Sequence, residues 1–561
     1  MAGCDTPSSF PDRFKDYLFA FLLYTACTLL FFLPSLGSLS GSLIGPPEDN
    51  MQFYWFIWHG ADTLLKNPTA LMHSSLIYYP EGVSLFYANY FYDGILITCL
   101  LKPFFSLPLI FNLLVLQSFI GAGVAFFALA RYVTKDFLAS LVAGFVFAFN
   151  PSHFAHSLHH VTIASIQFIP LFVLFFMKAL KEEKISFALL SALFLITSAL
   201  CDWNYLVFGL VFIFLSYVYL ALRAKKLILT GALKMIAILL FSTGLALSPL
   251  IVPMVWLGLT STFKRRLDGH DIYVADAAGF FVPHVYHLLS HLAPIQTLNE
   301  KMTGTDWEKT VYLGWANLTL IGVALHRSFK KNLSYFLGLF ACMILAMGSH
   351  PHVIGNMLPV VFPYKILEIT PLLTQARNPS RIIVFAYLFL ALLTALSLKE
   401  LLRGPKRASK ICAMVFVPFL FLDFYSVSNE MTRVELPKAY EAIVGDTSRD
   451  FGILELPWDG ARYMMYQSIH GIAGVQGYIG RRIENTLGNM LDYNDLHKQK
   501  EALIENKVKY IVIHKKKMDW NPKKARDIRY FLTLNNTCRA YADVYEKVFE
   551  DDDSATFKVY K

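Results

Sequence analysis

Residues 17–36 read YLFAFLLYTACTLLFFLPSL and contain no Asp, Glu, Lys or Arg. A helix of this length measures about 30 Å, which matches the hydrocarbon thickness of a bilayer. No small-residue cleavage site follows the segment. It is therefore predicted to remain in the chain as a membrane anchor rather than to be removed as a signal peptide.

The same apolar character extends over the whole chain of 561 residues, of which 55% are hydrophobic and only 16% are charged. A soluble domain cannot bury so much apolar surface, so the composition predicts a polytopic membrane protein. The formal charge of +9 would suggest nucleic acid as a partner in a soluble protein. Here the basic residues lie mainly in short clusters between apolar runs, where they set topology, and nucleic-acid binding is excluded.

About eleven apolar segments are long enough to be expected as membrane spans. They are 17–36, 108–130, 136–149, 161–180, 185–201, 204–222, 228–257, 311–326, 333–349, 382–402 and 410–428. A further piece, 92–107, is interrupted by Lys102 and Pro103. It is expected to be re-entrant or to lie at the membrane interface, because only then does the cluster of Arg131 and Lys135 fall on the cytoplasmic side.

With the N-terminus in the cytoplasm, every short inner connection carries basic residues, as topology requires. The uncommon acids, histidines and arginines then gather on the opposite face. We therefore predict a transmembrane domain over 1–428, with outer loops 37–91, 258–310 and 350–381, followed by an extracytoplasmic domain over 429–561.

The C-terminal region changes character, because its hydrophobic runs shorten to strand length. These runs are FGILEL at 451–456, VKYIVIH at 508–514 and TFKVY at 556–560, separated by charged stretches compatible with helices. Short strands that alternate with helices are typical of a small α/β domain.

The stretch PPEDNMQFYWFIWHG, residues 46–60, places Glu48 and Asp49 just after the first predicted span. Two prolines hold the backbone there extended. A carboxylate where the bilayer meets water becomes a better proton acceptor, which suits a general base. The alternative is that one acid caps the helix that starts near Asn50. The aromatic run after it would form an interfacial belt or a surface helix that walls a cavity.

The stretch NPSHFAHSLHH supplies four histidines, and three of them, His153, His156 and His160, share one helix face. That spacing suits metal ligands, but no HExxH pattern and no cysteine pair accompanies it, so a divalent metal stays an open alternative and no metal ligand is assigned. We expect instead that His156, His159 and His160 donate hydrogen bonds to a phosphate. A further polar position, Asp202, is predicted to be a turn residue, with a second cavity acid as the alternative.

Basic residues on the outer side run against the positive-inside rule and need a local reason. They are Lys264, Arg265, Arg266, Arg377 and Arg381. A guanidinium at headgroup depth suits a lipid phosphate or pyrophosphate bound through two parallel hydrogen bonds. The alternative is anchoring on ordinary phospholipid headgroups.

Several further blocks occur in order along the chain: YYPEG (78–82), HDIYVADAAGFFVP (270–283), EKTVYLG (308–314), FPYKILEITPLLTQARNPSR (362–381) and ELPWDGARYMMYQSIHGIAGVQGYIGRR (455–482). Together with the acidic dipeptide and the histidine-rich stretch, they resemble the GT-C superfamily of membrane glycosyltransferases that use polyprenyl-phosphate-linked sugars. The resemblance is to the bacterial branch akin to protein mannosyltransferases. It covers most of the chain.

The resemblance implies an inverting transfer of a hexosyl or pentosyl group from a polyprenyl-phosphate sugar to a glycan, lipid or protein acceptor at the periplasmic face of a bacterial inner membrane. By position, Asp49 or Glu48 would accept the proton of the acceptor. The implied partners are the lipid-linked sugar, the acceptor and membrane lipids, and no cofactor is certain. In other members a second acidic motif often stands where this chain has its histidines.

Two other classes of function stay open as alternatives. A polytopic transporter or flippase of envelope lipid or glycan would usually carry ionisable groups in the middle of its spans, and these spans are nearly free of charge. A non-catalytic membrane protein that binds the cell envelope would not depend on the acid pair.

Overall fold

The computed structural model describes residues 10–223, 226–260, 272–325, 328–370, 377–403, 407–480, 483, 485–515 and 538–561. The chain divides into two compact units, and each is described by itself. The first unit comprises Met1–Gly37, Leu113–Pro249 and Leu267–Glu430, and the second comprises Ser38–Asn112, Leu250–Arg266 and Met431–Lys561. The domain boundary at 428/429 stays a prediction.

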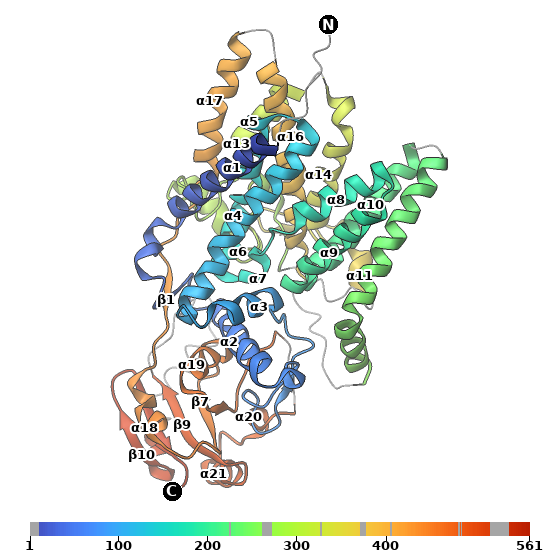
Figure 1. Cartoon of the computed structure of the whole chain (residues 1–561). Helices are drawn as coiled ribbons and strands as arrows, with labels where there is room; N and C mark the ends of the chain where they lie inside the picture. Colours follow the sequence, from blue (N-terminus) through green and yellow to red (C-terminus); the bar gives the residue numbers. More distant parts are fainter. Residues whose placement is uncertain are drawn as a thin grey trace. The chain divides into compact units, whose positions relative to one another are not determined.

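The first unit is helical (Figure 1). Its longer helices are α1 (Phe10–Phe31), α4 (Leu107–Thr134), α5 (Phe137–Ala148), α6 (Pro151–His159), α8 (Ile169–Glu182), α9 (Ile185–Cys201), α10 (Trp203–Arg223), α11 (Lys226–Thr260), α12 (Ala293–Lys301), α13 (Trp315–Leu325), α14 (Leu333–Ala346), α16 (Ile383–Arg403) and α17 (Arg407–Phe424). Its short elements are α7 (Val161–Ala164), η3 (Ala277–Phe280), η4 (Phe329–Asn332), β4 (His352–Val353), β5 (Asn356–Met357), α15 (Lys365–Ile369) and η5 (Pro379–Ile382), while η1 (Leu33–Ser38) ends at the junction of the units.

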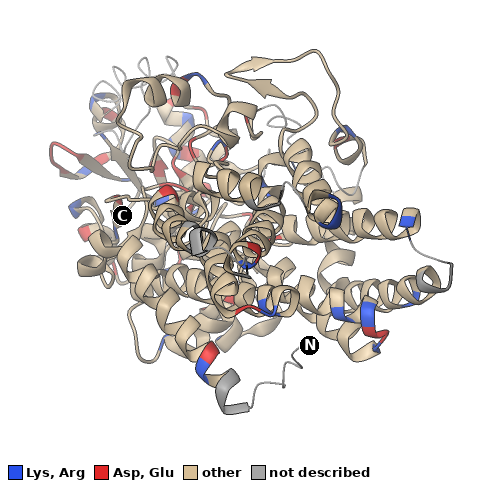
Figure 2. Cartoon of the chain, turned by 90° about the horizontal axis from the view of Figure 1, so that it is seen from above, with Lys and Arg blue, Asp and Glu red and all other residues tan. Residues whose placement is uncertain are grey.

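Seven helices among the described residues are long and apolar enough to cross a membrane. They are Phe14–Phe31, Leu107–Thr134, Phe137–His159, Trp203–Arg223, Leu229–Thr260, Phe329–Ala346 and Pro379–Leu402. Three shorter apolar helices accompany them, Tyr92–Leu101, Ile185–Cys201 and Met414–Phe424. The chain is therefore a multi-pass membrane protein, and the count of about eleven spans stays a prediction. Figure 2 colours the Lys, Arg, Asp and Glu residues and shows them mostly at helix ends and in connections, as expected because charged residues are costly inside a membrane.

Two predicted spans are shorter in the structure than in the sequence pattern. The segment 161–180 is divided between α7 and α8, which begins with Ile169-Pro170, because proline is favoured in the first turn of a helix and not inside one. The segment 311–326 becomes helical only at Trp315. Hydropathy counts apolar residues in both helices and extended loops, so it overestimates such segments.

The core of the first unit lies around α16, which packs against α5, α13, α14 and α17. Its residues are buried over most of the helix, which explains why it is apolar all round. Close contact between α1, α4 and α5 depends on two glycines. A Cβ at Gly123 would lie 2.6 Å from the ring of Tyr24, and one at Gly144 would lie 2.8 Å from the carbonyl oxygen of Gly123. The Tyr24 hydroxyl donates to the Leu141 carbonyl (2.8 Å).

The second unit combines the segment that follows α1 and η1, predicted to begin with an outer loop, with the C-terminal region. From this segment come β1 (Ser42–Ile44), α2 (Asn50–Lys66), η2 (Pro68–Ala70), β2 (His73–Ser74), β3 (Val83–Ser84) and α3 (Tyr92–Leu101). From the C-terminal region come β6 (Met431–Arg433), η6 (Lys438–Tyr440), α18 (Glu441–Gly445), β7 (Gly452–Leu456), α19 (Gly460–His470), β8 (Ala473–Gly474), α20 (Leu487–Met490), α21 (Leu496–Glu505), β9 (Val508–His514), β10 (Glu546–Glu550) and β11 (Ser554–Lys558).

A five-stranded sheet in the order β10-β11-β9-β7-β8 forms the centre of the C-terminal region, and β7 runs parallel to both β8 and β9. The predicted strands therefore exist, and the small α/β domain is confirmed. After β7 the chain forms β8 on one side of β7, and it then returns to form β9 on the other side of β7. The carboxyl ends of β7 and β9 thus meet at a topological switch point, which is where open α/β sheets bind ligands.

Candidate functional site

The two predicted catalytic acids stand at the start of α2 in the second unit. Asp49 occupies the N-cap position, and its backbone oxygen accepts from the N–H groups of Gln52 (3.0 Å) and Phe53 (3.2 Å). Its side chain makes no capping hydrogen bond, so the capping alternative is wrong for the Asp49 carboxylate. Glu48 is exposed and Asp49 is half-buried. Both carboxylates are therefore placed where a substrate hydroxyl can reach them.

The strand before these acids is fixed to the C-terminal region. β1 pairs with β6 in antiparallel register, with Ile44 opposite Met431. The Thr432 hydroxyl donates to the Gly45 carbonyl (2.9 Å), and Gly45 has a positive φ of 102°, which glycine adopts without steric cost. This pairing fixes the point from which Pro46 and Pro47 lead into the acid pair.

The aromatic run after the acids is buried, and the expectation of an interfacial belt or a surface helix is wrong. Phe53, Tyr54, Trp55 and Phe56 all have at most 4% of their surface exposed. The reason is that α2 packs on both α3 and α19. Bulky aromatic residues are favoured at protein–protein helix contacts as well as at membrane interfaces, and sequence alone does not separate the two environments.

Two hydrogen bonds fix α2 to the C-terminal region. The indole N–H of Trp55 donates to Gln467 Oε1 (2.8 Å) on α19, and Gln52 Nε2 donates to the Tyr478 carbonyl (2.7 Å). The ring of Trp55 also stacks on His59 at 4.5 Å between centroids. These buried contacts hold the helix that carries the acids at a defined position.

The histidine-rich stretch forms α6 in the first unit, and its four imidazoles divide between different surroundings. Asn150 caps the helix by accepting from the His153 N–H (2.9 Å). His153 stacks on Phe119 at 3.9 Å and contacts Ser118 Oγ (3.1 Å), so it has a packing role. On another face, His159 packs on Trp307 at 4.2 Å.

The remaining two histidines, His156 and His160, lie 5.7 Å apart between ring centroids. Nε2 of His156 is 3.9 Å from Glu308 Oε2. Among the described residues, no group of three or more His, Cys, Asp or Glu side chains could hold a metal ion. The three histidines that share a helix face, His153, His156 and His160, therefore do not form a set of metal ligands, because the His153 ring stacks on Phe119.

Arg381 is bound by a carboxylate that the sequence pattern did not single out. Its Nε donates to Glu308 Oε1 (2.9 Å), and its Nη2 lies 2.8 Å from the same oxygen. The Ser380 hydroxyl donates to the other oxygen of Glu308. Glu308 is 1% exposed. Its signal in the sequence was the block EKTVYLG, in which an acid and a lysine stand shortly before the helix that starts at Trp315.

The electrostatics of Glu308 follow from this pair. Burial alone would raise the pKa of the carboxyl group, but the Arg381 guanidinium and, to a smaller extent, His156 outweigh burial and lower the pKa of Glu308 to about 2. Glu308 is thus ionised at neutral pH. Arg381 is therefore already paired with a carboxylate before any ligand binds to it.

The other predicted cations are less constrained by the structure. Arg377 is half-buried, and its guanidinium lies 5.9 Å from the centroid of Tyr273. Lys264, Arg265 and Arg266 lie outside the described residues. Asp202 is a turn residue as predicted: its Oδ1 accepts from the Asn204 backbone N–H (2.9 Å), and its Oδ2 accepts from Thr162 (3.1 Å).

An apolar groove of about 440 Å³ lies in the same unit, and Ile382, which follows Arg381 in the chain, is part of its lining. Its wall starts with Ile382 on the approach to α16, continues over Phe385 and Phe212, and extends along α10 as far as Leu222. From Phe208 to Leu222, α10 rises about 20 Å. The groove therefore offers an elongated apolar surface next to a polar cluster.

A second buried polar cluster, also missed from the sequence, lies in the second unit around Glu455 on β7. The Tyr440 hydroxyl donates to Glu455, and it lies 3.3 Å from Nε2 of His514 at the end of β9. Burial raises the pKa of Glu455 from its usual 4.5 to about 8, and burial lowers the pKa of His514 to about 3. Both groups are therefore uncharged at neutral pH.

Stability of the second unit is expected to decline as pH rises between about 6.5 and 8, because below pH 6.5 the titration of His514 in the unfolded chain acts in the opposite direction. Over that range the unfolded chain ionises Glu455 while the folded chain holds it protonated, and this costs up to about 1.4 kcal/mol per pH unit. Glu455→Gln removes the titration while it keeps an acceptor for Tyr440. Thermal unfolding at about pH 6.5 and pH 8, where His514 no longer contributes, should show a smaller difference for this variant than for the wild type. Equal differences would contradict a buried neutral acid.

Solved structures similar to this chain are membrane glycosyltransferases. The oligosaccharyltransferase AglB from Archaeoglobus fulgidus, in complex with an inhibitory peptide and a dolichol-phosphate, matches with a TM-score of 0.54 and 11% identity over 96% of this chain and 73% of that chain. The arabinofuranosyltransferase AftD from Mycobacteria matches with a TM-score of 0.60 and 13% identity, over 96% of this chain and 40% of that chain. No curated protein sequence matches the chain.

These comparisons establish the GT-C fold, as the sequence blocks predicted. Residues 40–427 also match the model of one protein family, described as a domain of unknown function, DUF6311. The chain belongs to this family, which takes in the first outer loop and the helical region up to α17.

Proposed function

We propose that this protein is a glycosyltransferase that moves a sugar from a polyprenyl-phosphate donor to a cell-envelope acceptor, with inversion, at the periplasmic face of a bacterial inner membrane. The observation that carries the proposal is a GT-C fold in which a carboxylate pair begins the first outer-loop helix. Glycosyltransferases are the proteins that the comparisons return for this fold.

In the proposed reaction, Asp49 or Glu48 accepts the proton of an acceptor hydroxyl. The acceptor oxygen forms a bond to the anomeric carbon from the face opposite the phosphate, and the bond between that carbon and the phosphate oxygen breaks. Polyprenyl phosphate leaves with one additional negative charge. Fixed cations that meet this charge lower the barrier, and such electrostatic stabilisation is usually the main source of an enzyme's rate enhancement.

The groove that includes Ile382, next to Arg381 in the chain, supports a lipid donor. A prenyl chain needs an apolar path of about the length that α10 provides, and its phosphate needs cations at one end of that path. Two described residues, Arg381 and Arg377, are candidates for binding the donor phosphate. The same role is proposed for Lys264, Arg265 and Arg266. Hydrogen bonds to the phosphate would come from His156, His159 and His160. Since Glu308 already holds Arg381, we assign Glu308 the role of orienting that guanidinium.

A strain that lacks the gene tests the proposal. Mass spectrometry of its envelope glycans and lipids is expected to show one sugar missing from one product and recovery after complementation with the wild-type gene. An unchanged profile would contradict the transferase. Loss of transport of an otherwise complete glycan or lipid across the membrane would instead identify a flippase.

A further inference from the structure

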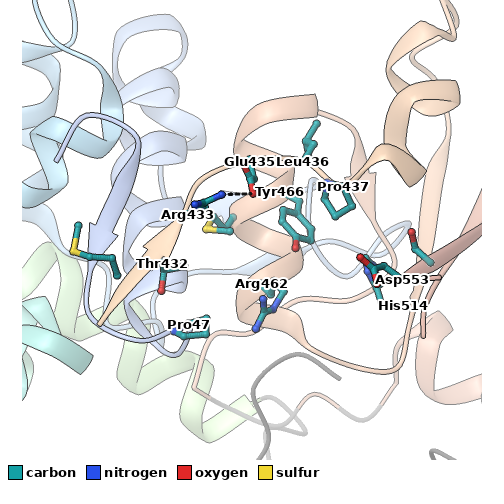
Figure 3. Close-up of a pocket in the computed structure, with 13 residues that line it drawn as sticks. Pro47, Thr432, Arg433, Glu435, Leu436, Pro437, Arg462, Tyr466, His514 and Asp553 are labelled. Carbon is teal, nitrogen blue, oxygen red and sulfur yellow. Dashed lines mark ion pairs between the residues drawn. The ribbon is translucent and has the colours of Figure 1, made fainter. Parts of the chain in front are cut away.

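The second unit contains a cavity of about 440 Å³ at the carboxyl end of its parallel strands. It is lined by Arg462 and Tyr466 of α19, His514 of β9, Arg433 of β6 and Asp553, and it also touches Pro47. Figure 3 shows Arg462 and Tyr466 extending from the same helix, with the pair of Arg433 and Glu435 on one side and His514 and Asp553 on the other. The volume is within the range of about 300–1,000 Å³ of small-molecule sites.

The topology explains why polar residues gather here. His514 is the last residue of β9, and the chain enters α19 four residues after β7 ends at Leu456. The ends of these two strands form the switch point of the sheet, where neighbouring connections diverge and leave a crevice. Arg462 and Tyr466 are four residues apart and therefore point from the same face of α19.

The charges around the cavity balance. Its lining includes two guanidinium groups, Arg433 and Arg462, and two carboxylates, Glu435 and Asp553. Arg462 Nε donates to Asp459 (3.2 Å), which holds the side chain in place, and Arg433 lies 3.9 Å from Glu435 in an exposed pair. The described lining residues therefore give an anion little net attraction and do not by themselves favour a phosphate.

The lining instead combines groups that only donate hydrogen bonds, the guanidiniums, with groups that only accept them, the carboxylates. Tyr466 and Ser554 add hydroxyls that do both. A ligand that satisfies such a set presents donors and acceptors from the same groups at short intervals, as neighbouring sugar hydroxyls do.

We propose that this cavity is a saccharide-binding site that holds the sugar portion of the acceptor. Its role as an acceptor subsite rests on the proposed glycosyltransferase function. Pro47 lines the cavity and is two residues from Asp49, so the two Cα atoms lie within about 7 Å of each other. A saccharide in the cavity would thus present a hydroxyl near the proposed base, and the pairing of β1 with β6 keeps that distance fixed.

Saturation-transfer difference NMR on the full-length protein in nanodiscs, without glycoside detergent, tests the site. The probes are methyl α-mannopyranoside, methyl β-glucopyranoside, methyl β-galactopyranoside and methyl α-arabinofuranoside, with inorganic phosphate and a blocked Ala-Thr-Ala peptide as competitors. At least one glycoside should give a signal with the wild type. Arg462→Met and Arg433→Met should each weaken its binding about tenfold, while the exposed Arg449→Met, in the same unit but outside the cavity, should not.

Arg462 also contacts Asp459, so its variant is compared with the wild type by thermal unfolding, and Arg433→Met, at an exposed position, gives the same readout with little risk to folding. Absence of any glycoside signal with the wild type, displacement by phosphate or by the peptide alone, or undiminished signals in both variants would overturn the proposal. The two proposals can fail separately. If a glycoside binds in the cavity but deletion of the gene leaves the envelope sugars unchanged, the saccharide site is retained and the transferase function is refuted.

Discussion

Asp49→Asn or Glu48→Gln is expected to reduce sugar transfer by about 10²–10⁴-fold, because a positioned general base contributes a factor of that size. Only the residue that accepts the proton should show the full effect, so the pair of variants identifies the base. The measurement is the amount of sugar-bearing product per amount of membrane-inserted protein in the complemented deletion strain. Because Asp49 makes no capping bond through its side chain, its amide replacement should leave α2 folded.

Asp62→Asn is the matched control for these variants. Asp62 lies on the same helix, where it pairs with Lys66 (2.9 Å) at a partly exposed position. Such pairs contribute at most about 1 kcal/mol, so this variant should transfer sugar at the wild-type rate. Full activity of both Asp49→Asn and Glu48→Gln would contradict a base in the first outer loop and would favour a non-catalytic membrane protein.

Breaking the pair of Glu308 and Arg381 is expected to destabilise the first unit by about 3–5 kcal/mol, because either single change leaves an uncompensated buried charge. Glu308→Gln and Arg381→Met should both lower the temperature of unfolding in nanodiscs. The double variant should recover part of the loss, since it removes both charges. Glu182→Gln, which removes an exposed partner of Lys184, should change the stability little.

The same pair gives a pH dependence with a defined sign. The pKa of Glu308 is lowered from 4.5 to about 2, so the stabilisation is complete above pH 4.5 and is lost as pH falls towards 2. This shift corresponds to about 3 kcal/mol. Acid unfolding should therefore begin at a higher pH in Glu308→Gln than in the wild type. Coincident acid transitions would show that the carboxylate is not held ionised by Arg381.

Much of the fold could be predicted from local pattern. Long apolar runs predicted the long helices, and short hydrophobic runs predicted β7, β9 and β11. Both predictions depend only on local sequence pattern. The burial of Trp55 could not be predicted in this way. Its partner Gln467 is 412 residues away, and no local pattern indicates a contact over that separation.

The candidate site was predictable to a similar extent. Arg381 and the histidines stood out as uncommon residues on one predicted face, but their partners did not. Glu308 balances Arg381, and His153 turns to Phe119, so residues of the same type in one stretch take different roles. Glu455 was hidden within an apolar strand, where a single acid indicates an exposed alternate position rather than a buried neutral group.

The packing of α2 on α19 has a consequence for the order of synthesis. The ribosome makes Asp49 early, yet the elements that hold this segment are made much later, since β6 begins at Met431 and α19 at Gly460. An incomplete nascent polypeptide therefore lacks the scaffold that fixes these acids. A truncated product that ends before residue 430 would therefore lack the strand and the helix that hold the proposed base in place.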